Sequence, residues 1–279
     1  MRTDLPPELP ARAVVLAVRP EVDGARYPAK RVVGESVEVE ADIIGDGHDV
    51  LRAQLLHRPP GATEWHEIEL HHKANDTWCA TFETTVMGRH HYTVIAWVDA
   101  FATWRRGLER KFAAGTDVKV ELLEGAMLVE RVAPDVAKKL RGDAPVPDRV
   151  AIATSTALAE TMQRHPDKTH ASRYRHELEI LVERPLAAAS AWYEFFPRSF
   201  GGLRESEKML AYVAELGFDI VYLPPIHPIG LAFRKGPDNA PTAGPNDPGS
   251  PWAIGAAEGG HTAVHPKLGT LADFDHFVA

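Results

Sequence analysis

A long segment rich in proline and glycine carries the polar side chains best suited to chemistry. It runs from Pro224 to Gly260, contains eight prolines and seven glycines, and shows no helix or strand periodicity. Loops of this length in compact domains are usually functional or disordered, and the apolar Ile226, Trp252 and Ile254 favour an ordered, functional loop. Its polar residues are His227, Arg234, Lys235, Asp238, Asn239, Asp247, Glu258 and His261.

The residue types and their spacing exclude several common chemistries. No G-x-x-x-x-G-K-[ST] or G-x-G-x-x-G motif follows a candidate strand, so a glycine-rich phosphate-binding loop is not expected. His227, His261 and His265 match no zinc-ligand spacing, and no carboxylate stands beside them at helical separation. We therefore expect no metal site and no cofactor.

Other groups of polar residues have structural explanations. The pairs His71-His72 and His90-His91 lie in predicted strands, where adjacent side chains point to opposite faces. We therefore expect solvated histidines there and no shared ligand pair. The basic run from Trp104 to Lys111 is expected to form a surface ion-pair network or a domain contact on an otherwise acidic chain.

The elements that precede the long loop must position it. Ala191 to Phe196 is a short aromatic strand, and Leu203 to Leu216 has a helical apolar stripe that Gly217 should end. Phe218 to Leu223 is a nearly continuous apolar run, typical of a parallel strand covered on both faces. Such a β-α-β unit begins either a (β/α) barrel or a doubly wound sheet. In a barrel, the loop would lie at the active-site end of the strand.

The region from Ala13 to about Ala113 has a different pattern. Short alternating segments are separated by turn residues every eight to twelve positions, which is typical of an antiparallel β-sandwich. The expected strands are Ala13 to Val18, Val37 to Ile44, Val50 to His57, Trp65 to Leu70, Thr77 to Glu83 and His90 to Val98.

Between these two regions the spacing of the apolar residues becomes typical of helices. Apolar residues from Val118 to Val129 recur at three and four. A second helical pattern begins at Pro147 and ends at His165-Pro166, and a third helix is expected from Ala171 to Leu181. The middle of the chain is therefore predicted to be a small helical domain.

Composition and charge narrow the class of protein. The 279 residues are 44% hydrophobic and 25% charged, which is typical of soluble globular domains. A net charge of -8 gives no attractive field for nucleic acid or an anionic membrane, and no apolar run approaches the ~20 residues of a membrane span. The start of the chain has no signal-peptide core, so a cytoplasmic location is expected. We divide the chain into a sandwich domain over 1–113, a helical domain over 114–184 and a strand-helix-strand domain over 185–279.

Several motifs carry a family likeness. In the last domain they are Trp192 to Ser199, Gly217 to Gly230, Phe233 to Gly236, Pro251 to Gly255, Glu258 to His261 and His265 to Thr270. Upstream they are Arg31 to Glu35, Asp46 to Asp49, Ala96 to Asp99, Thr103 to Arg105 and Glu121 to Ala126. Together they resemble the α-1,4-glucan:maltose-1-phosphate maltosyltransferases of the α-amylase superfamily, glycoside hydrolase family 13. The Arg234-Lys235-Gly236 stretch looks specific to the maltosyltransferases.

The resemblance implies a multidomain protein. An immunoglobulin-like sandwich and a helical domain would precede the first strands of a (β/α)8 TIM barrel. The implied activity transfers maltosyl from α-maltose 1-phosphate to the non-reducing end of an α-1,4-glucan with retention, which requires two carboxyl groups about 5 to 5.5 Å apart. In the superfamily these groups follow the fourth and fifth strands, whereas this chain ends at Ala279, after the second. We therefore expect no catalytic residue in this chain and no activity from it alone.

The resemblance also implies substrate contacts within the chain. Lys235 matches a lysine that binds the maltosyl phosphate donor, and its ammonium group can donate to sugar hydroxyls or phosphate oxygens. Asn239 and Trp252 are further substrate-binding candidates, as an amide for a hydroxyl and an aromatic platform. Asp238 departs from the family pattern, which suggests asparagine at this position. A homodimer through the N-terminal domains is also implied.

Two other functions remain open. An α-glucan hydrolase or branching enzyme would share the barrel start but should lack the Arg234-Lys235-Gly236 stretch. A non-catalytic glucan-binding or dimerisation module would use the sandwich and helical domains without the barrel chemistry. The sequence downstream of Ala279 would separate these alternatives, because an enzyme needs further strands that carry an Asp and then a Glu.

Overall fold

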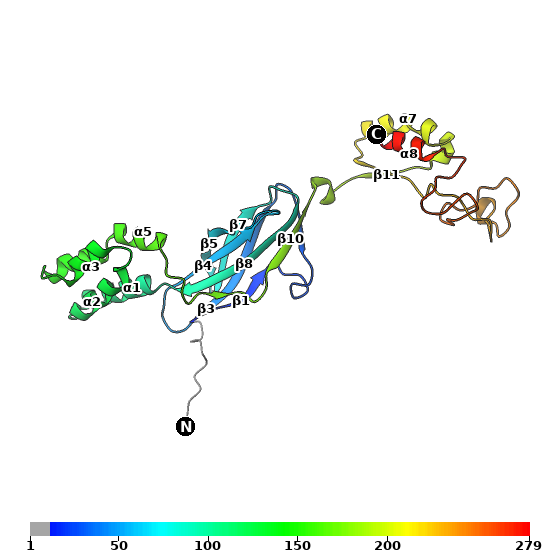
Figure 1. The fold of residues 1–279 in the computed structure, drawn as a ribbon. Coiled ribbons are helices and arrows are strands. Elements are labelled where there is room, and N and C mark those ends of the chain that lie inside the picture. Colours follow the sequence, from blue (N-terminus) through cyan, green and yellow to red (C-terminus); the bar gives the residue numbers. More distant parts are fainter. Residues whose placement is uncertain (1–11) are drawn as a thin grey trace, which may run out of the picture. The chain divides into compact units, whose positions relative to one another are not determined.

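The computed structural model describes residues 12–279 of the chain (Figure 1). The chain folds as two compact units, of which the first ends at Pro185 and the second spans Leu186–Ala279. The first unit is rich in strands and carries a group of helices, and the second mixes two short strands with helices and a long loop. No helix within residues 12–279 is long and apolar enough to cross a membrane.

Two β-sheets form most of the first unit. One sheet has the strand order β1-β3-β7-β6, with β1 (Ala13–Arg19), β3 (Ser36–Gly45), β7 (Thr77–Glu83) and β6 (His71–Ala74). The other has the order β2-β10-β8-β4-β5 with β9 beside β8, and its strands are β2 (Ala29–Val32), β10 (Leu178–Glu183), β8 (Gly88–Val98), β4 (Leu51–Arg58), β5 (His66–Glu69) and β9 (Ser172–Arg173).

Both sheets contribute to one hydrophobic core. Alternate residues of β3, such as Val37 and Val39, are fully buried with Leu55 of β4 and Val94 of β8. This alternation of buried and exposed side chains is what a strand with one face on a core requires. The six strands expected between residues 13 and 98 are confirmed, whereas β2 was not expected and the strand that holds His71 and His72 is a separate one, β6, beyond the strand expected to end at Leu70.

The prediction of a helix from Ala171 to Leu181 is wrong. The segment instead forms β9 and β10, and β10 pairs antiparallel with β8 and parallel with β2. Leu178, Ile180 and Val182 are buried in the core of the sheets, which is a period of two. The parallel pairing also means that the sheet is not purely antiparallel.

A group of five helices is inserted between β8 and β9. The helices are α1 (Ala100–Ala113), α2 (Lys119–Val129), α3 (Pro134–Arg141), α4 (Val146–Ala153) and α5 (Thr156–Arg164). The helical region therefore begins before residue 114, and the Asp99 side chain caps α1 by accepting from the Ala102 N–H at 2.8 Å. Trp104, Leu108 and Leu122 belong to a separate buried core between these helices. The single helix expected from Pro147 to His165 is instead two helices, α4 and α5, because Ser155 caps a new helix; the second of them ends at Arg164, as expected.

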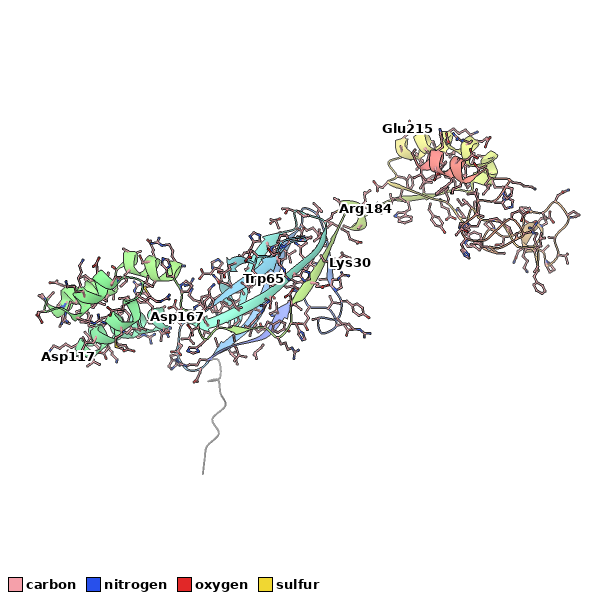
Figure 2. All side chains as sticks on the ribbon, in the orientation of Figure 1. Lys30, Trp65, Asp117, Asp167, Arg184 and Glu215 are labelled. Carbon is pink, nitrogen blue, oxygen red and sulfur yellow. The ribbon has the colours of Figure 1, made fainter. Side chains whose placement is uncertain are left out.

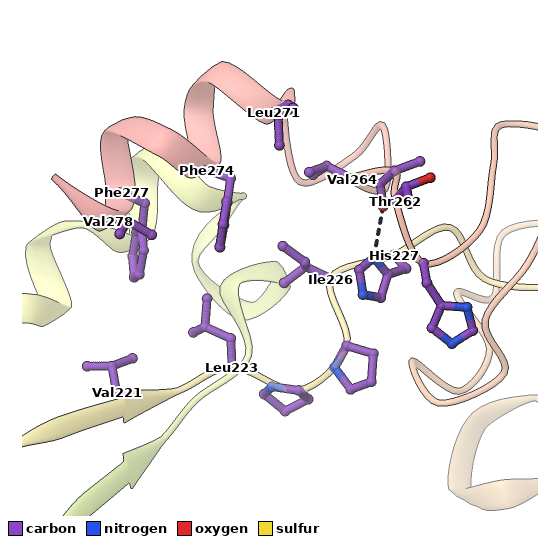
Figure 3. Close-up of a pocket in the computed structure, with 14 residues that line it drawn as sticks. Val221, Leu223, Ile226, His227, Thr262, Val264, Leu271, Phe274, Phe277 and Val278 are labelled. Atoms are coloured by element: carbon purple, nitrogen blue, oxygen red, sulfur yellow. Dashed lines mark hydrogen bonds between the residues drawn. The ribbon is translucent and has the colours of Figure 1, made fainter. Parts of the chain in front are cut away.

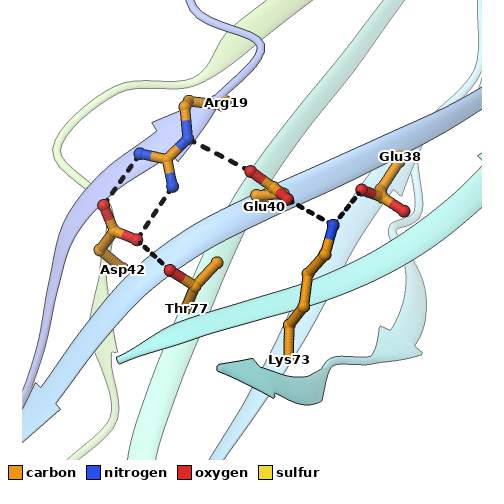
Figure 4. Close-up of polar contacts among 6 residues, drawn as sticks. All are labelled: Arg19, Glu38, Glu40, Asp42, Lys73 and Thr77. Carbon is orange, nitrogen blue, oxygen red and sulfur yellow. Dashed lines mark hydrogen bonds and ion pairs between the residues drawn. The ribbon is translucent and has the colours of Figure 1, made fainter. Parts of the chain in front are cut away.

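A ladder of charged side chains crosses the four-stranded sheet (Figure 4). Arg19 donates to both oxygens of Asp42, at 2.8 and 2.9 Å, and lies 3.5 Å from a carboxylate oxygen of Glu40. Lys73 bridges Glu38 and Glu40 at 2.8 and 2.7 Å. Because all of these side chains are partly exposed to solvent and satisfy one another, we assign the ladder to strand pairing on the surface and not to a binding site.

A buried pair of histidines lies beside the core of the sheets. His57 of β4 and His90 of β8 are 7% and 0% exposed, so the expectation of a solvated histidine is wrong for His90. Nε2 of His90 donates to the Val86 carbonyl at 2.7 Å, which leaves its Nδ1 to accept the Nε2–H of His57 at 3.0 Å. The His57 ring also stacks on Phe82, with 3.9 Å between centroids. This arrangement fits two neutral imidazoles.

Acid is expected to destabilise the first unit through His57. Burial, and then the neighbouring His90 and His66, lower the pKa of His57 from 6.5 to about 4. The unfolded chain therefore binds a proton near pH 6.5, whereas the folded chain binds it only near pH 4. This contribution to the free energy of unfolding is complete above pH 6.5 and is lost as the pH falls to 4, by about 3 kcal/mol in total.

Urea unfolding across this pH range measures the effect. His57→Gln keeps an N–H for His90 but does not titrate, so its stability should fall less steeply between pH 6.5 and 4 than that of the unchanged protein. His71→Gln, at an exposed position of β6, should keep the original slope. Equal slopes for His57→Gln and the unchanged protein would show that the buried pair does not set the acid sensitivity.

The second unit begins with a β-α-β arrangement, as the sequence predicted. β11 (Trp192–Glu194) and β12 (Ile220–Tyr222) pair in parallel, with Tyr193 beside Val221. Between them lie α6 (Leu203–Ser206) and α7 (Lys208–Glu215). The long loop follows β12, and α8 (Leu271–Val278) closes the unit.

Local signals fix the end of α7 and the start of α8. After α7, Gly217 adopts a φ of 82°, its N–H donates to the Ala214 carbonyl at 3.0 Å, and the Phe218 N–H donates to Val213 at 3.3 Å. These two bonds form a Schellman motif, so the prediction that Gly217 ends the helix is confirmed. At the start of α8, Thr270 and Asp273 form a reciprocal capping box.

Candidate functional site

The long loop leaves the carboxyl end of β12 and is held by an arginine. Arg234 donates to three backbone carbonyls: Ile229 at 2.8 Å, Gly230 at 3.0 Å and Asp247 at 3.2 Å. Gly249 lies against its stem, where an added Cβ would be only 2.7 Å from Cγ of Arg234. The guanidinium of Arg234 therefore holds two parts of the loop together and has few donors left for a ligand.

Backbone hydrogen bonds hold the loop together at a second place. Gly230 donates to the Ala253 carbonyl at 2.7 Å, and Gly255 donates to the Pro228 carbonyl at 2.9 Å. Residues 229 and 254 form an isolated antiparallel bridge. The loop thus makes its own internal bonds, as a segment that positions side chains must do.

The three predicted substrate-binding residues fall into two places. Lys235 and Asn239 lie on one short turn, which the Gly236 N–H closes by donating to the Ala240 carbonyl at 3.0 Å. Both side chains are exposed, and Asn239 has a φ of 62°, a conformation that asparagine tolerates well. Trp252 does not share this turn. It is 58% exposed, and its ring lies edge-on to Phe196 with 6.1 Å between centroids.

Two basic residues near the strand ends were not predicted as site residues. Arg198 lies in a 3-10 turn (Pro197–Phe200) soon after β11 and is half-buried, and burial followed by the nearby charge of Arg234 lowers its pKa. Burial and then Arg198 lower the pKa of His265, whereas Glu258 acts in the opposite direction. The sequence did contain a signal that Arg198 could belong to the site, because Pro197 and Arg198 come soon after the predicted strand. Arg198 and Arg234 give the strand ends a positive local charge.

An apolar groove lies beside β12 (Figure 3). Its volume is about 570 Å³, and Val221, Leu223 and Ile226 line it together with Phe274 and Phe277 of α8. Two histidines lie at the loop end of the groove: the centroids of His227 and His261 are 5.7 Å apart, and Nδ1 of His227 donates to the Ala263 carbonyl at 3.0 Å. Among the described residues, no group of three or more His, Cys, Asp or Glu side chains is arranged to hold a metal ion.

Comparison with known proteins identifies the family of this chain. A family model described as α-1,4-glucan:maltose-1-phosphate maltosyltransferase, domain N/S, matches residues 11–184, which is more than half of the chain. The chain belongs to the α-1,4-glucan:maltose-1-phosphate maltosyltransferase family. Its sheets and inserted helices therefore correspond to the N/S domain of these maltosyltransferases.

Individual maltosyltransferases match beyond that domain. The enzyme of Myxococcus xanthus is 48% identical over 94% of this chain and 43% of its own length. The enzyme of Chlorobaculum tepidum is 44% identical over 100% of this chain and 44% of its own length, and an enzyme of Streptomyces coelicolor is 42% identical over 98% and 43%. The chain thus spans less than half the length of these maltosyltransferases, and the second unit with its long loop falls inside the matched stretch.

Proposed function

We propose that the chain is the N-terminal part of a maltosyltransferase that moves maltosyl from α-maltose 1-phosphate to the non-reducing end of an α-1,4-glucan with retention. The observation that carries the proposal is the match of the whole chain, long loop included, to an enzyme with that name at 44% identity. A phosphorylated donor fits a cytoplasmic enzyme, and we include that location in the proposal.

We further propose that the sheets of the first unit form an immunoglobulin-like sandwich with a helical insert, and that a (β/α)8 barrel begins near residue 185. The parallel pair β11 and β12, with helices between them, supports a barrel start. The apolar groove beside β12 supports it as well, since a further strand and helix of a barrel would cover such a surface.

The proposed roles divide the chemistry between this chain and the rest of a complete enzyme. A retaining mechanism needs a nucleophile and an acid/base about 5 to 5.5 Å apart. In the proposed barrel these two groups follow the fourth and fifth strands, so this chain would supply no catalytic residue and would be inactive alone. It would supply donor contacts: Lys235 as a charged donor to phosphate or hydroxyl oxygens, Asn239 as an amide and Trp252 as an aromatic platform.

We also propose a homodimer through the helices of the first unit. On α2, Val120, Leu123 and Met127 are 74%, 49% and 72% exposed, while Leu122 and Ala126 on the other side are fully buried. The three exposed residues follow each other at three and four, so they form one stripe along the helix. An exposed apolar stripe on a helix that is already packed on its other face favours a protein contact.

Replacing residues of this apolar stripe by glutamate is expected to convert the proposed dimer to a monomer. In sedimentation experiments, Leu123→Glu together with Met127→Glu should shift a dimer to the monomer mass without loss of helix content. Met87→Glu, at a 59% exposed position in the turn between β7 and β8, is the matched control and should leave the mass unchanged. A dimer that survives the double substitution would assign the contact to another surface.

The products of a chimera test the function itself. In this chimera, our chain replaces the corresponding 43% of the Myxococcus xanthus enzyme. With α-maltose 1-phosphate and a maltooligosaccharide, we expect inorganic phosphate together with glucans longer by two glucose units. Free maltose without elongated glucan would instead support a hydrolase, and changed branching without phosphate release would support a branching enzyme.

A further inference from the structure

A second pocket lies in the first unit, where β4 and β5 meet the segment from Gln163 to Lys168. Figure 2 labels Asp167, which belongs to this segment. The volume of the pocket is about 490 Å³. Four cationic side chains line it, Arg52, Arg131, Arg164 and Lys168, against the two carboxylates Glu67 and Glu69. A net positive pocket is the opposite of what a chain of net charge -8 presents on average.

Two of the four cations are already paired. Arg52 donates to both oxygens of Glu69 at 2.8 Å, and Lys168 donates to Glu67 at 2.8 Å. Both cations also lie near the ring of Trp97, with 5.4 Å and 5.6 Å to its centroid. These pairs build a fixed wall of the pocket from β4, β5 and the loop after α5.

The other two cations, Arg131 and Arg164, come from the helical side. Within residues 12–279, no carboxylate oxygen lies within 4.0 Å of either guanidinium. Arg164 stands in the last turn of α5, where a cation also favours the helix carbonyls, and its one side-chain bond is a 3.4 Å contact to Thr161. Asp167 is near Arg131, but its oxygen accepts from the N–H and hydroxyl of Thr169 at 3.0 and 2.5 Å. Both guanidiniums therefore keep most of their donors free.

The wall of the pocket also contains an acceptor without a donor. The side-chain oxygen of Gln54 is buried and has no hydrogen-bond partner among the described residues. Gln54 lines the same pocket as Arg131 and Arg164. A ligand that carries a hydroxyl group would supply the missing donor.

We propose that this pocket binds a phosphate monoester that carries hydroxyl groups, such as a phosphorylated sugar. The two guanidiniums present planar forks that match phosphate oxygens, and Gln54 accepts from a hydroxyl of the organic part. Because Arg131 and Arg164 belong to the helical region whereas Arg52 and Gln54 belong to β4, the ligand would hold the helical region against the sheet. All residues that line the pocket belong to the first unit, and the inference does not depend on the proposed transferase activity.

Calorimetric titration of the full chain, at constant ionic strength set with chloride, tests the proposal. We expect saturable binding of inorganic phosphate and of glucose 1-phosphate, with the ester binding more tightly. Arg131→Gln with Arg164→Gln should weaken both by at least about tenfold. Arg110→Gln with Lys138→Gln removes the same charge from exposed positions outside the pocket and should change neither. Gln54→Met should weaken only the ester.

Thermal unfolding without ligand shows whether each variant is folded. If the double arginine variant melts lower than its control, Arg131→Lys with Arg164→Lys keeps the charge while removing the forks, and it should also bind the ester more weakly. Equal binding in the arginine variant and its control would overturn the proposal. Binding of glucose or maltooligosaccharides without any binding of phosphate would overturn it as well, because the anion is then not the recognised group.

Discussion

Replacing Gly125 by valine is expected to destabilise the helical region by at least about 3 kcal/mol, because overpacking of a filled core commonly costs 1 to 3 kcal/mol and this site cannot relax. A Cβ at Gly125 of α2 would lie 1.9 Å from Cζ2 of Trp104. Trp104 is 7% exposed, and its Nε1 donates to the Glu121 carbonyl at 2.7 Å, so the indole is fixed by both packing and a hydrogen bond. The free energy of unfolding in urea measures the effect.

Gly107 offers a matched control on α1. An added Cβ there meets no atom within 4 Å. Gly107→Ala should therefore stabilise the protein by about 0.5 to 1 kcal/mol, the usual gain when alanine replaces glycine inside a helix. If Gly125→Val were as stable as the unchanged protein, the contact between α2 and Trp104 would be incorrectly described.

The sequence predicts the strands of the first unit well where one face is buried. β7 matches its predicted range, because strict alternation and the Asn75-Asp76 turn define it. β10 was mistaken for a helix because Ala171, Tyr174, Leu178 and Leu181 also recur at three and four. Only pairing with β8, some ninety positions earlier in the chain, decides between the two periods. Asp99 is the N-cap residue of α1, and an aspartate before a helix is a recognisable start signal in the sequence. The prediction nevertheless placed the segment that follows it in the sandwich domain.

The long loop shows where sequence patterns stop being informative. Its position after a parallel strand was predicted, and the structure has it there. The expectation that this strand is covered on both faces is wrong, because β12 is only partly buried and Tyr222 is 40% exposed. Arg234 looked like one more polar candidate, yet its partners are backbone carbonyls of Ile229, Gly230 and Asp247. No residue type signals a backbone acceptor, so this role of Arg234 follows only from the folded loop. The roles of Lys235 and Trp252 remain predictions.

Lys235→Ala in the chimera is expected to lower kcat/KM for α-maltose 1-phosphate by about 10- to 150-fold. A charge-assisted hydrogen bond contributes roughly 1.5 to 3 kcal/mol, which gives this range. Contacts made equally in the ground and transition states would raise KM, whereas contacts that strengthen as charge develops would lower kcat as well. Because Lys235 is exposed, its removal should leave the melting temperature unchanged.

Lys208→Ala on α7 is the control for this prediction. Lys208 is also an exposed lysine of the second unit but lies on a helix and not on the long loop. Its removal should change kcat/KM by no more than the about 0.5 kcal/mol that is usual for surface substitutions. If Lys235→Ala and Lys208→Ala behave alike, Lys235 does not contact the donor.

Phosphate release from α-maltose 1-phosphate by separated and joined parts tests the central claim most directly. The three samples are this chain alone, the matching remainder of the Myxococcus xanthus enzyme alone, and the chimera that joins them, each with the same glucan acceptor. We predict release only by the chimera, because the proposed catalytic carboxylates and this chain's donor contacts are both needed. Release by this chain alone, or a folded chimera with a cooperative melt and no release, would contradict the assignment of the chain as the N-terminal part of a maltosyltransferase.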